Sequence, residues 1–302
     1  MKQTIVLLAL AVPALLLANT GVAFLKVPVG PRFVATGEAA AGYVDDASAL
    51  YYNPAGLANV ATYSGLLAHN QGFLDMNQEY LAGVYGSEGL GKFGLALDYW
   101  GSGSIQGINI RGETIPGYAF SAADWSLDLG YARSFSDFSV GLGFKLIREQ
   151  NESLSTSALA LDAGVMYKTP LKGLQAGISV ANLGTKAKLY HESYNLPLEG
   201  RLGWRYDVSI IGVMQDFILS ETEKPGIAAG LECRPVQMLA IRAGYRTGSD
   251  HDGLSGLRAG LGINWHGIGI DYAYAPYGKL GASHRLSISY RGSAESEETE
   301  ED

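Results

Sequence analysis

The chain has 302 residues, of which 22 are basic and 30 acidic, and six of the acids lie between Glu295 and Asp302. Outside that end the charge is close to neutral, so the sequence predicts no basic surface for nucleic acid. Cys233 is the only cysteine, which excludes an intramolecular disulfide and therefore a small disulfide-stapled domain.

Residues 1–23 read as a secretory signal peptide. Lys2 supplies a positive charge, residues 4–18 are uncharged and mostly apolar, and the small residues Gly21 and Ala23 precede Phe24. Ala18 is a second candidate cleavage site. The alternative is a single membrane-anchoring helix, but the apolar run is shorter than a bilayer requires. The pattern predicts export, with the outer membrane as the destination once the strands below are considered.

Residues 24–61 predict a plug or hatch segment with short helices. In DDASALYYNPAGLANV, Asp45 or Asp46 is a candidate cap for a first short helix. Asn53 is a strong N-cap and Pro54 suits the first position of a second helix, in the fragment NPAGLA that also contains Gly56. A sharp corner is therefore expected at Asn53. Asp45 and Asp46 could also bind a cation, although helix capping explains them more simply.

From residue 62 to residue 291 the sequence alternates between apolar and small or polar residues. In LRAGLGINW, starting at Leu257, the apolar side chains fall on one face, which is typical of half-buried strands. About fourteen such segments follow one another, most near the length of a membrane-spanning strand. They are expected to start near Thr62, Asn77, Lys92, Ala123, Asp137, Ser157, Gly173, Leu198, Val208, Gly226, Met238, Leu257, Ile268 and His284.

The connections between these segments alternate in length. Residues 101–122, 183–197 and 247–256 form long connections, whereas residues 134–136 and the pair His266–Gly267 form short turns. Short turns on the periplasmic side and long loops outside are typical of outer-membrane barrels.

Charged residues on the second strand face separate a membrane barrel from a soluble β-sandwich. An arginine facing lipid at the bilayer midplane would cost ~2–4 kcal/mol, so these charges must face a polar lumen. A sandwich would also need a second layer to cover its apolar face. The predicted fold is an all-β, antiparallel transmembrane barrel of about fourteen strands with a helical N-terminal plug. The predicted lumen-facing charges are Asp98, Asp128, Asp162, Arg201, Arg205, Glu232, Arg242, Arg246, Arg258, Asp271 and Arg285.

Residues 292–302 predict a disordered, acidic periplasmic tail. This end has six acids and no base from Ser293 onward, and it cannot bury enough apolar surface to fold. A solvated end is the simpler role, and a docking strip for a basic periplasmic partner is the alternative.

Several blocks of the sequence resemble a known family. GYVDDASALYYNPAGLA, ISVANLG, LPLEGRLGW, LAIRAGY and LGINWHGIGIDYAYAPYGKLGASHRLSISYR resemble, in this order, blocks of the PorV/PorQ-type outer-membrane barrels within the FadL-like superfamily. The resemblance implies a 14-stranded barrel with its N-terminal segment in the lumen. Some relatives act in type IX protein secretion and surface delivery, and others move hydrophobic small molecules. Secretion is the first hypothesis and passive transport is the alternative.

No pattern of residues indicates catalysis. The five histidines are scattered, no HExxH or G-x-S-x-G motif is present, and the paired strand glycines lack the sixth-position glycine of a dinucleotide fingerprint. Residues 250–253 (DHDG) resemble half of a calcium loop without its distal glutamate, and a surface turn explains them better. We therefore expect no enzyme activity, no metal and no cofactor, with a membrane-embedded lipid esterase as a distant third hypothesis. The expected partners are outer-membrane lipid together with secretion components, secreted proteins or hydrophobic small molecules.

Overall fold

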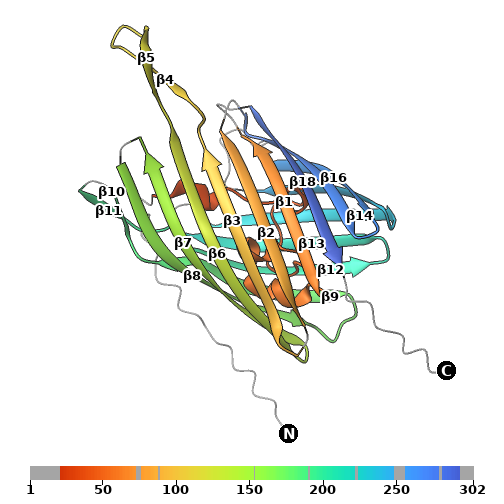
Figure 1. The fold of residues 1–302 in the computed structure, drawn as a ribbon. Coiled ribbons are helices and arrows are strands. Elements are labelled where there is room, and N and C mark those ends of the chain that lie inside the picture. Colours follow the sequence, from red (N-terminus) through yellow and green to blue (C-terminus); the bar gives the residue numbers. More distant parts are fainter. Residues whose placement is uncertain are drawn as a thin grey trace, which may run out of the picture.

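The computed structural model describes residues 21–72, 76–87, 89–152, 154–189, 191–221, 224–247, 256–278 and 281–292. In this part the chain forms a closed β-barrel around its own N-terminal segment (Figure 1). None of the helices in the described ranges is long and apolar enough to cross a membrane. Residues 1–20, the 250–253 turn and the acidic tail from residue 293 lie outside the described residues.

Four short helical segments precede the strands. They are η1 (Ala23–Lys26), α1 (Pro31–Ala35), α2 (Ala49–Tyr52) and η2 (Pro54–Asn59). The strands of the barrel are β1 (Tyr63–Gln71), β2 (Asn77–Ser87), β3 (Gly91–Gly101), β6 (Ala122–Phe135), β7 (Phe138–Asn151), β8 (Leu154–Lys168), β9 (Leu174–Gly184), β12 (Glu199–Val208), β13 (Ile211–Ser220), β14 (Gly226–Val236), β15 (Leu239–Arg246), β16 (Leu257–Trp265), β17 (Ile268–Pro276) and β18 (Ala282–Gly292). Two hairpins stand apart from the barrel, namely β4 (Ile105–Ile108) with β5 (Thr114–Phe120) and β10 (Ala187–Leu189) with β11 (Glu192–Tyr194).

The barrel closes where the last strand meets the first. β1 pairs with β18 from Tyr63↔Gly292 to Gln71↔His284, and each barrel strand is antiparallel to both of its neighbours. The order of the fourteen strands follows the sequence, except that the two hairpins are bypassed. Closure leaves no unpaired strand edge in the wall, which a lipid environment requires. The predicted fold class, an antiparallel barrel of about fourteen strands, is confirmed.

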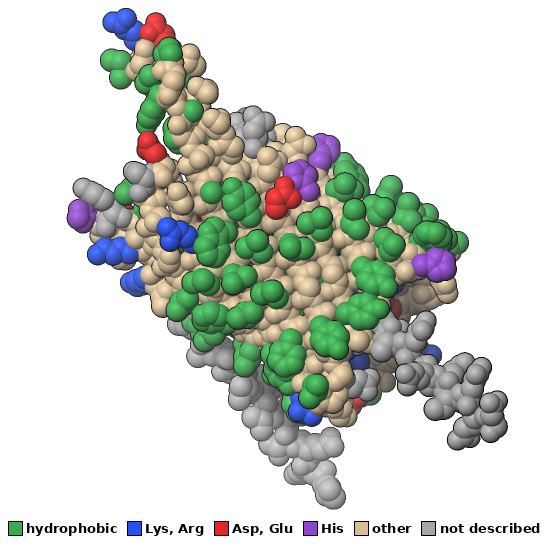
Figure 2. All heavy atoms as spheres, viewed as in Figure 1, with side chains coloured by type: hydrophobic (Ala, Val, Ile, Leu, Met, Phe, Trp, Pro, Cys, Tyr) green, Lys and Arg blue, Asp and Glu red, His purple; other side chains and the backbone are tan. Residues whose placement is uncertain are grey.

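Side chains alternate between the outside and the lumen along the barrel strands. In β2, for example, Leu81 and Tyr85 are exposed while Ala82 and Val84 are buried. Figure 2 shows apolar side chains covering the middle of the face formed by β1, β2, β3, β6 and β7, with charged side chains near its ends. Such a belt removes the need for a covering layer, because lipid takes its place.

The two ends of the barrel differ. At the end that we call the short-turn end, tight turns join β6 to β7, β12 to β13 and β16 to β17. His266 and Gly267 both have positive φ, 48° and 81°, as a two-residue turn of type I′ requires. The opposite end, the long-loop end, carries both extra hairpins, and β4–β5 projects far beyond the barrel (Figure 1).

The structure corrects the sequence-based description in three places. Val208 ends β12 instead of starting the next strand, because the turn Ser209–Ile210 interrupts an apolar run that shows no alternation. β8 begins at Leu154, ahead of the expected Ser157. The long connections at residues 101–122 and 183–197 are not plain loops, since each folds into a two-stranded hairpin.

Residues 22–60, which we call the plug, lie inside the barrel. α1 packs against β15, β16, β17 and β18, whereas η2 packs against β3, β6, β7 and β8. The plug supplies most of the largest apolar cluster, which includes Phe33, Leu50, Tyr52 and Leu57. The core of this protein is therefore the contact between plug and wall, and not a contact between two sheets.

Candidate functional site: the plug and the lumen wall

The plug is anchored to one half of the wall through Glu38. Its side chain is 1 % exposed and forms ion pairs with Arg246 on β15 and with Arg258 on β16, whose Nη2 lies 3.8 Å from Oε1. Arg201 on β12 donates from Nη1 to the Glu38 carbonyl oxygen at 2.8 Å. Burial by itself raises the pKa of the Glu38 carboxyl. The positive charges of Arg246, Arg258 and Arg201 lower this pKa by more than burial raises it, so the net pKa is below its usual value.

Glu38 also has an unusual backbone. Its φ is +71°, in the left-handed region that non-glycine residues seldom adopt, and it follows Gly37 at φ +69°. The amide of Glu38 donates to the Phe33 carbonyl at 2.7 Å, which ends α1. The turn directs the Glu38 carboxylate toward Arg246 and Arg258 of the wall.

The wall also holds the plug through its backbone. Asp216 on β13 accepts two hydrogen bonds from the plug. Its Oδ2 accepts from the backbone amides of Ala40 and Ala41 at 2.9 Å each. Ser179 on β9 donates to the Tyr52 carbonyl at 3.1 Å, and Arg285 on β18 donates to the Pro28 carbonyl. These bonds satisfy polar groups of an irregular segment that has few partners of its own.

The corner at Asn53 forms as the sequence indicates. Asn53 has an extended backbone, and its Oδ1 accepts from the Ala55 amide at 3.1 Å, with Pro54 at the first helical position. The helix that follows is a 3-10 helix. Asn53 also reaches outward from this cap, since its Nδ2 donates to the Ala41 carbonyl at 2.9 Å.

The two aspartates before α2 have different roles. Asp46 Oδ1 accepts from the amide of Ser48 at 3.0 Å, which supports the start of α2, and Oδ2 accepts from Arg32 at 2.8 Å. Asp45 does not cap the helix. It pairs with Arg32 and with Arg291 of β18, so burial raises the pKa of its carboxyl while these two arginines lower it to a net value below the usual range.

Inward-facing glycines of the wall mark where the plug touches it. A Cβ added at Gly177 would lie 2.0 Å from the Ala41 carbonyl oxygen, and one at Gly164 would lie 1.9 Å from Asn53 Oδ1. Similar conflicts would arise at Gly141, Gly230 and Gly244, in each case with plug backbone. These strand glycines are required for close approach of the plug. Within the plug, Gly56 has the same role, since a Cβ added there would lie 2.2 Å from Val44 Cγ1.

The lumen has an apolar half and a charged half. On the β1–β8 side, the inward residues at the apolar clusters are mostly small or aliphatic, among them Leu66, Ala82, Ala96, Ala132 and Ala160. The β12–β18 side carries a network of arginines and acids, in which Arg242 bonds Glu232 at 2.7 Å and Asp271 at 2.5 Å. The plug matches this division, with Leu50 and Leu57 toward the first half and Glu38 toward the second.

A smaller polar patch interrupts the apolar half. Asp98, Asp128 and Asp162 lie on β3, β6 and β8 with buried side chains. Lys145 on β7 pairs with Asp162 at 2.7 Å, and Gln78 donates to Asp98 at 3.0 Å. Asn182 lies in a β-bulge of β9 with φ +64°. Its backbone amide donates to Asp162 Oδ1 at 2.8 Å.

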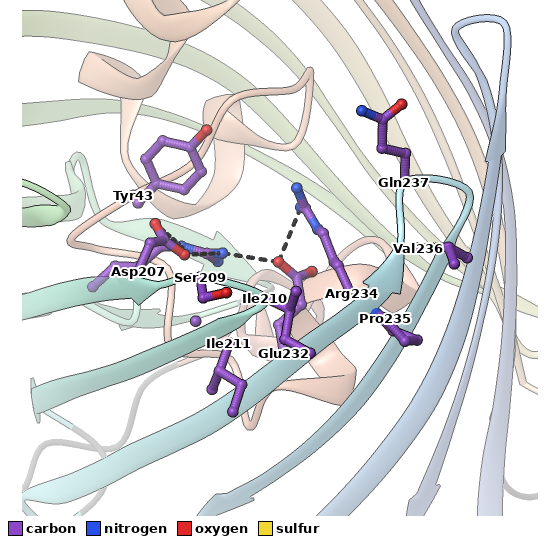
Figure 3. Close-up of a pocket in the computed structure, with 12 residues that line it drawn as sticks. Tyr43, Asp207, Ser209, Ile210, Ile211, Glu232, Arg234, Pro235, Val236 and Gln237 are labelled. Atoms are coloured by element: carbon purple, nitrogen blue, oxygen red, sulfur yellow. Dashed lines mark hydrogen bonds and ion pairs between the residues drawn. The ribbon is translucent and has the colours of Figure 1, made fainter.

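At the short-turn end the lumen opens into a pocket of about 530 Å³ (Figure 3). Arg205 and Arg234 both reach Glu232 at 2.9 Å, and Arg205 also bonds Asp207. Tyr43 of the plug lies against Arg205, whose guanidinium carbon is 5.1 Å from the ring centre. The opening of the lumen at the short-turn end is therefore narrowed by ion pairs between strands and by Tyr43 of the plug.

All eleven charges expected to face the lumen are buried within the barrel, in the positions described above. Four ionic residues with comparable roles were missed by the sequence reasoning. They are Arg32, Glu38, Lys92 and Asp216. Asp216 stands on the polar face of a strand whose outward face is apolar, so the same alternation could have found it. Among the described residues no group of three or more metal-ligand side chains converges.

These features define a transmembrane β-barrel whose lumen is occupied by its own N-terminal segment. No protein-family model matches the chain, and no curated protein matches it either. Several solved structures, however, superpose on the chain. The toluene transporter TbuX of Ralstonia pickettii superposes with a TM-score of 0.65 at 14% identity, covering 87% of this chain and 98% of that chain. The toluene transporter TodX of Pseudomonas putida gives 0.63 at 12% identity, covering 91% and 97%.

A FadL homologue of Pseudomonas aeruginosa also superposes, with a TM-score of 0.54 at 12% identity, covering 87% of this chain and 98% of that chain. At these identities the likeness is one of fold. It bears out the barrel fold that the family resemblance implies. Membership of the FadL-like superfamily and of its PorV/PorQ branch both stay predictions.

Proposed function

We propose that the protein is a passive outer-membrane channel for a hydrophobic small molecule, with the plug as its gate. The observation that carries this proposal is the apolar lining on one side of the lumen, because a channel for water-soluble solutes has a polar interior. Charges on the opposite side hold the plug, and outside the polar patch around Asp128 the apolar side is lined by small and aliphatic residues.

The apolar lining begins near the long-loop end. Phe24 and Leu25 of the plug are buried there against Ile147, Ala158 and Ala160 of the wall. Trp100 and Tyr194 are half-buried at the rim of this cluster. The plug side chains occupy the space that an apolar solute would need, so entry requires η1 to move.

The second apolar cluster lies beyond the polar patch around Asp128, toward the short-turn end. Leu50 and Leu57 lie over Gly94 and Gly130 of the wall, and the cluster extends to Leu66. The solved structures support the proposal, since TbuX and TodX are toluene transporters with this fold. They do not identify the solute of this chain, so we propose only the class.

Uptake by intact cells tests the proposal. Cells with the barrel in their outer membrane should take up labelled toluene or oleate faster than cells without it. Ala160→Asn places an amide in the apolar cluster and should reduce this uptake, whereas Ser289→Asn, an equally buried substitution in the charged half, should not. Equal uptake with and without the protein would rule out the channel.

Protein secretion or surface attachment is the second candidate. It is favoured by the β4–β5 hairpin, which projects from the long-loop end (Figure 1) and exposes Ile105, Ile108, Ile110 and Tyr118. Exposed apolar residues on a projecting element suit a protein partner. Removal of residues 104–120 should then abolish partner recovery in a mild-detergent pull-down without changing hydrocarbon uptake.

A further inference from the structure

The outer surface of the barrel carries an apolar groove that the channel proposal does not use. It has a volume of about 800 Å³ and crosses β2, β3, β6, β7 and β8 on the face seen in Figure 2. One wall is the row Leu95, Leu129, Phe144 and Leu161, which face one another on adjacent strands. The residues of the opposite wall are Tyr85, Phe93, Tyr131 and Leu142.

The floor of the groove is backbone. Gly94, Gly130 and Gly143 lie between the two rows, and their missing side chains would point into the lumen. On β1 and β2 the row is also open on the outside, because Gly65 and Gly83 face each other and a Cβ at either would meet no atom within 4 Å. A flexible hydrocarbon chain can therefore lie against the wall more closely here than elsewhere on the belt.

The depth of the groove in the membrane follows from its strand positions. At the β1–β2 side it starts close to the short-turn end, and at β8 it reaches Leu161 in the middle of the strand. The aromatic wall marks the interfacial level, where Tyr side chains are favoured. The ring centres of Phe93 and Tyr131 lie 4.9 Å apart, and the Tyr131 hydroxyl donates to the Leu90 carbonyl at 3.1 Å.

A cation stands just beyond this aromatic row. Arg133 follows Tyr131 on the same outward face of β6, and it lies over the Phe135 ring at 5.7 Å. No carboxylate of the described residues pairs with it. A guanidinium at the interface is suited to a phosphate.

We propose that this groove holds one phospholipid of the leaflet at the short-turn end, with an acyl chain between the two rows and the phosphate at Arg133. Apolar surface alone does not favour this lipid over its neighbours, because the surrounding chains are equally apolar. The selectivity comes from the open space that Gly65 and Gly83 leave on the outer face, which increases packing contacts, and from the charged contact.

The test is the phospholipid that remains on the purified barrel after washing in dodecyl maltoside, measured by mass spectrometry. About one phospholipid per barrel should remain on the parent protein. Gly83→Leu and Gly65→Leu fill open space, so both should fold, show normal heat-modifiable migration and retain less than half as much. Ala243→Leu places the same side chain on the outward face of β15 and should retain as much as the parent.

The headgroup contact is tested separately. Arg133→Gln should reduce retention of phosphatidylglycerol, whereas Lys172→Gln, in the turn between β8 and β9, should not. Equal retention in parent and Gly83→Leu, or equal loss in Ala243→Leu, would overturn the proposal. Recovery of lipid A in place of phospholipid would overturn it as well, because it would assign the groove to the other leaflet. None of these results depends on whether the barrel transports a solute.

Discussion

Replacement of Glu38 by glutamine should release the plug while leaving the barrel intact. The substitution keeps the shape of the side chain and the backbone, but it removes the only negative charge that Arg246 and Arg258 share in the plug. Taking away one partner of a buried ion pair costs about 3–5 kcal/mol, since the remaining charges stay buried. Part of this cost is offset by Glu199, which lies 3.7 Å from Arg246.

We therefore expect docking of the plug to weaken by about 3 kcal/mol, which is a factor of about one hundred in its opening equilibrium. Hydrogen exchange measures this directly. Amides of residues 30–60 should exchange about two orders of magnitude faster, while those of the barrel strands keep their protection. The pairing of the barrel strands should be unaffected, because Glu38 takes part in no backbone hydrogen bond between strands.

Glu79→Gln is the matched control. Glu79 is half-exposed on β2, where it pairs with His69 at 2.6 Å on the outer face, and such a pair contributes at most about 1 kcal/mol. Unchanged plug protection in Glu38→Gln would refute the reasoning. Equal loss of protection in the barrel strands would also refute it, because the plug would then be part of the barrel's own stability.

Three further predictions concern the same contacts. Asn53→Ala should lower local stability by about 1 kcal/mol through loss of the cap, seen as faster exchange of residues 45–58 alone, and equal protection would contradict it. Gly177→Val should prevent the plug from seating against Ala41, so trypsin should cleave the plug in this variant but not in Gly200→Val, where a Cβ has space. Because the pKa values of Glu38 and Asp45 are lowered in the fold, their stabilisation is present above about pH 4 and is lost below it. Pepsin should accordingly cleave the plug faster as the pH falls below 4, and a constant rate would count against the ion pairs.

The sequence by itself determined the wall of this barrel. A strand has a period of two, so the alternation in a segment such as residues 257–265 shows which side chains share a face, whatever the strand pairs with. The high cost of a charge in lipid then assigns Arg258 to the lumen without knowledge of its partner. The cap at Asn53 was also readable, because the Ala55 amide that it binds is two residues away.

Only the tertiary structure decided what the lumen contacts are. Arg246 meets Glu38 across 208 positions of sequence, and Arg201 reaches it across 163, so closure of the barrel and the register of its strands bring them together. The same holds for Gly177, whose missing side chain has a purpose only because Ala41 passes over it. Local spacing encodes the face on which a residue lies, but a contact between plug and wall depends on how fourteen strands close around a segment that has little regular structure of its own.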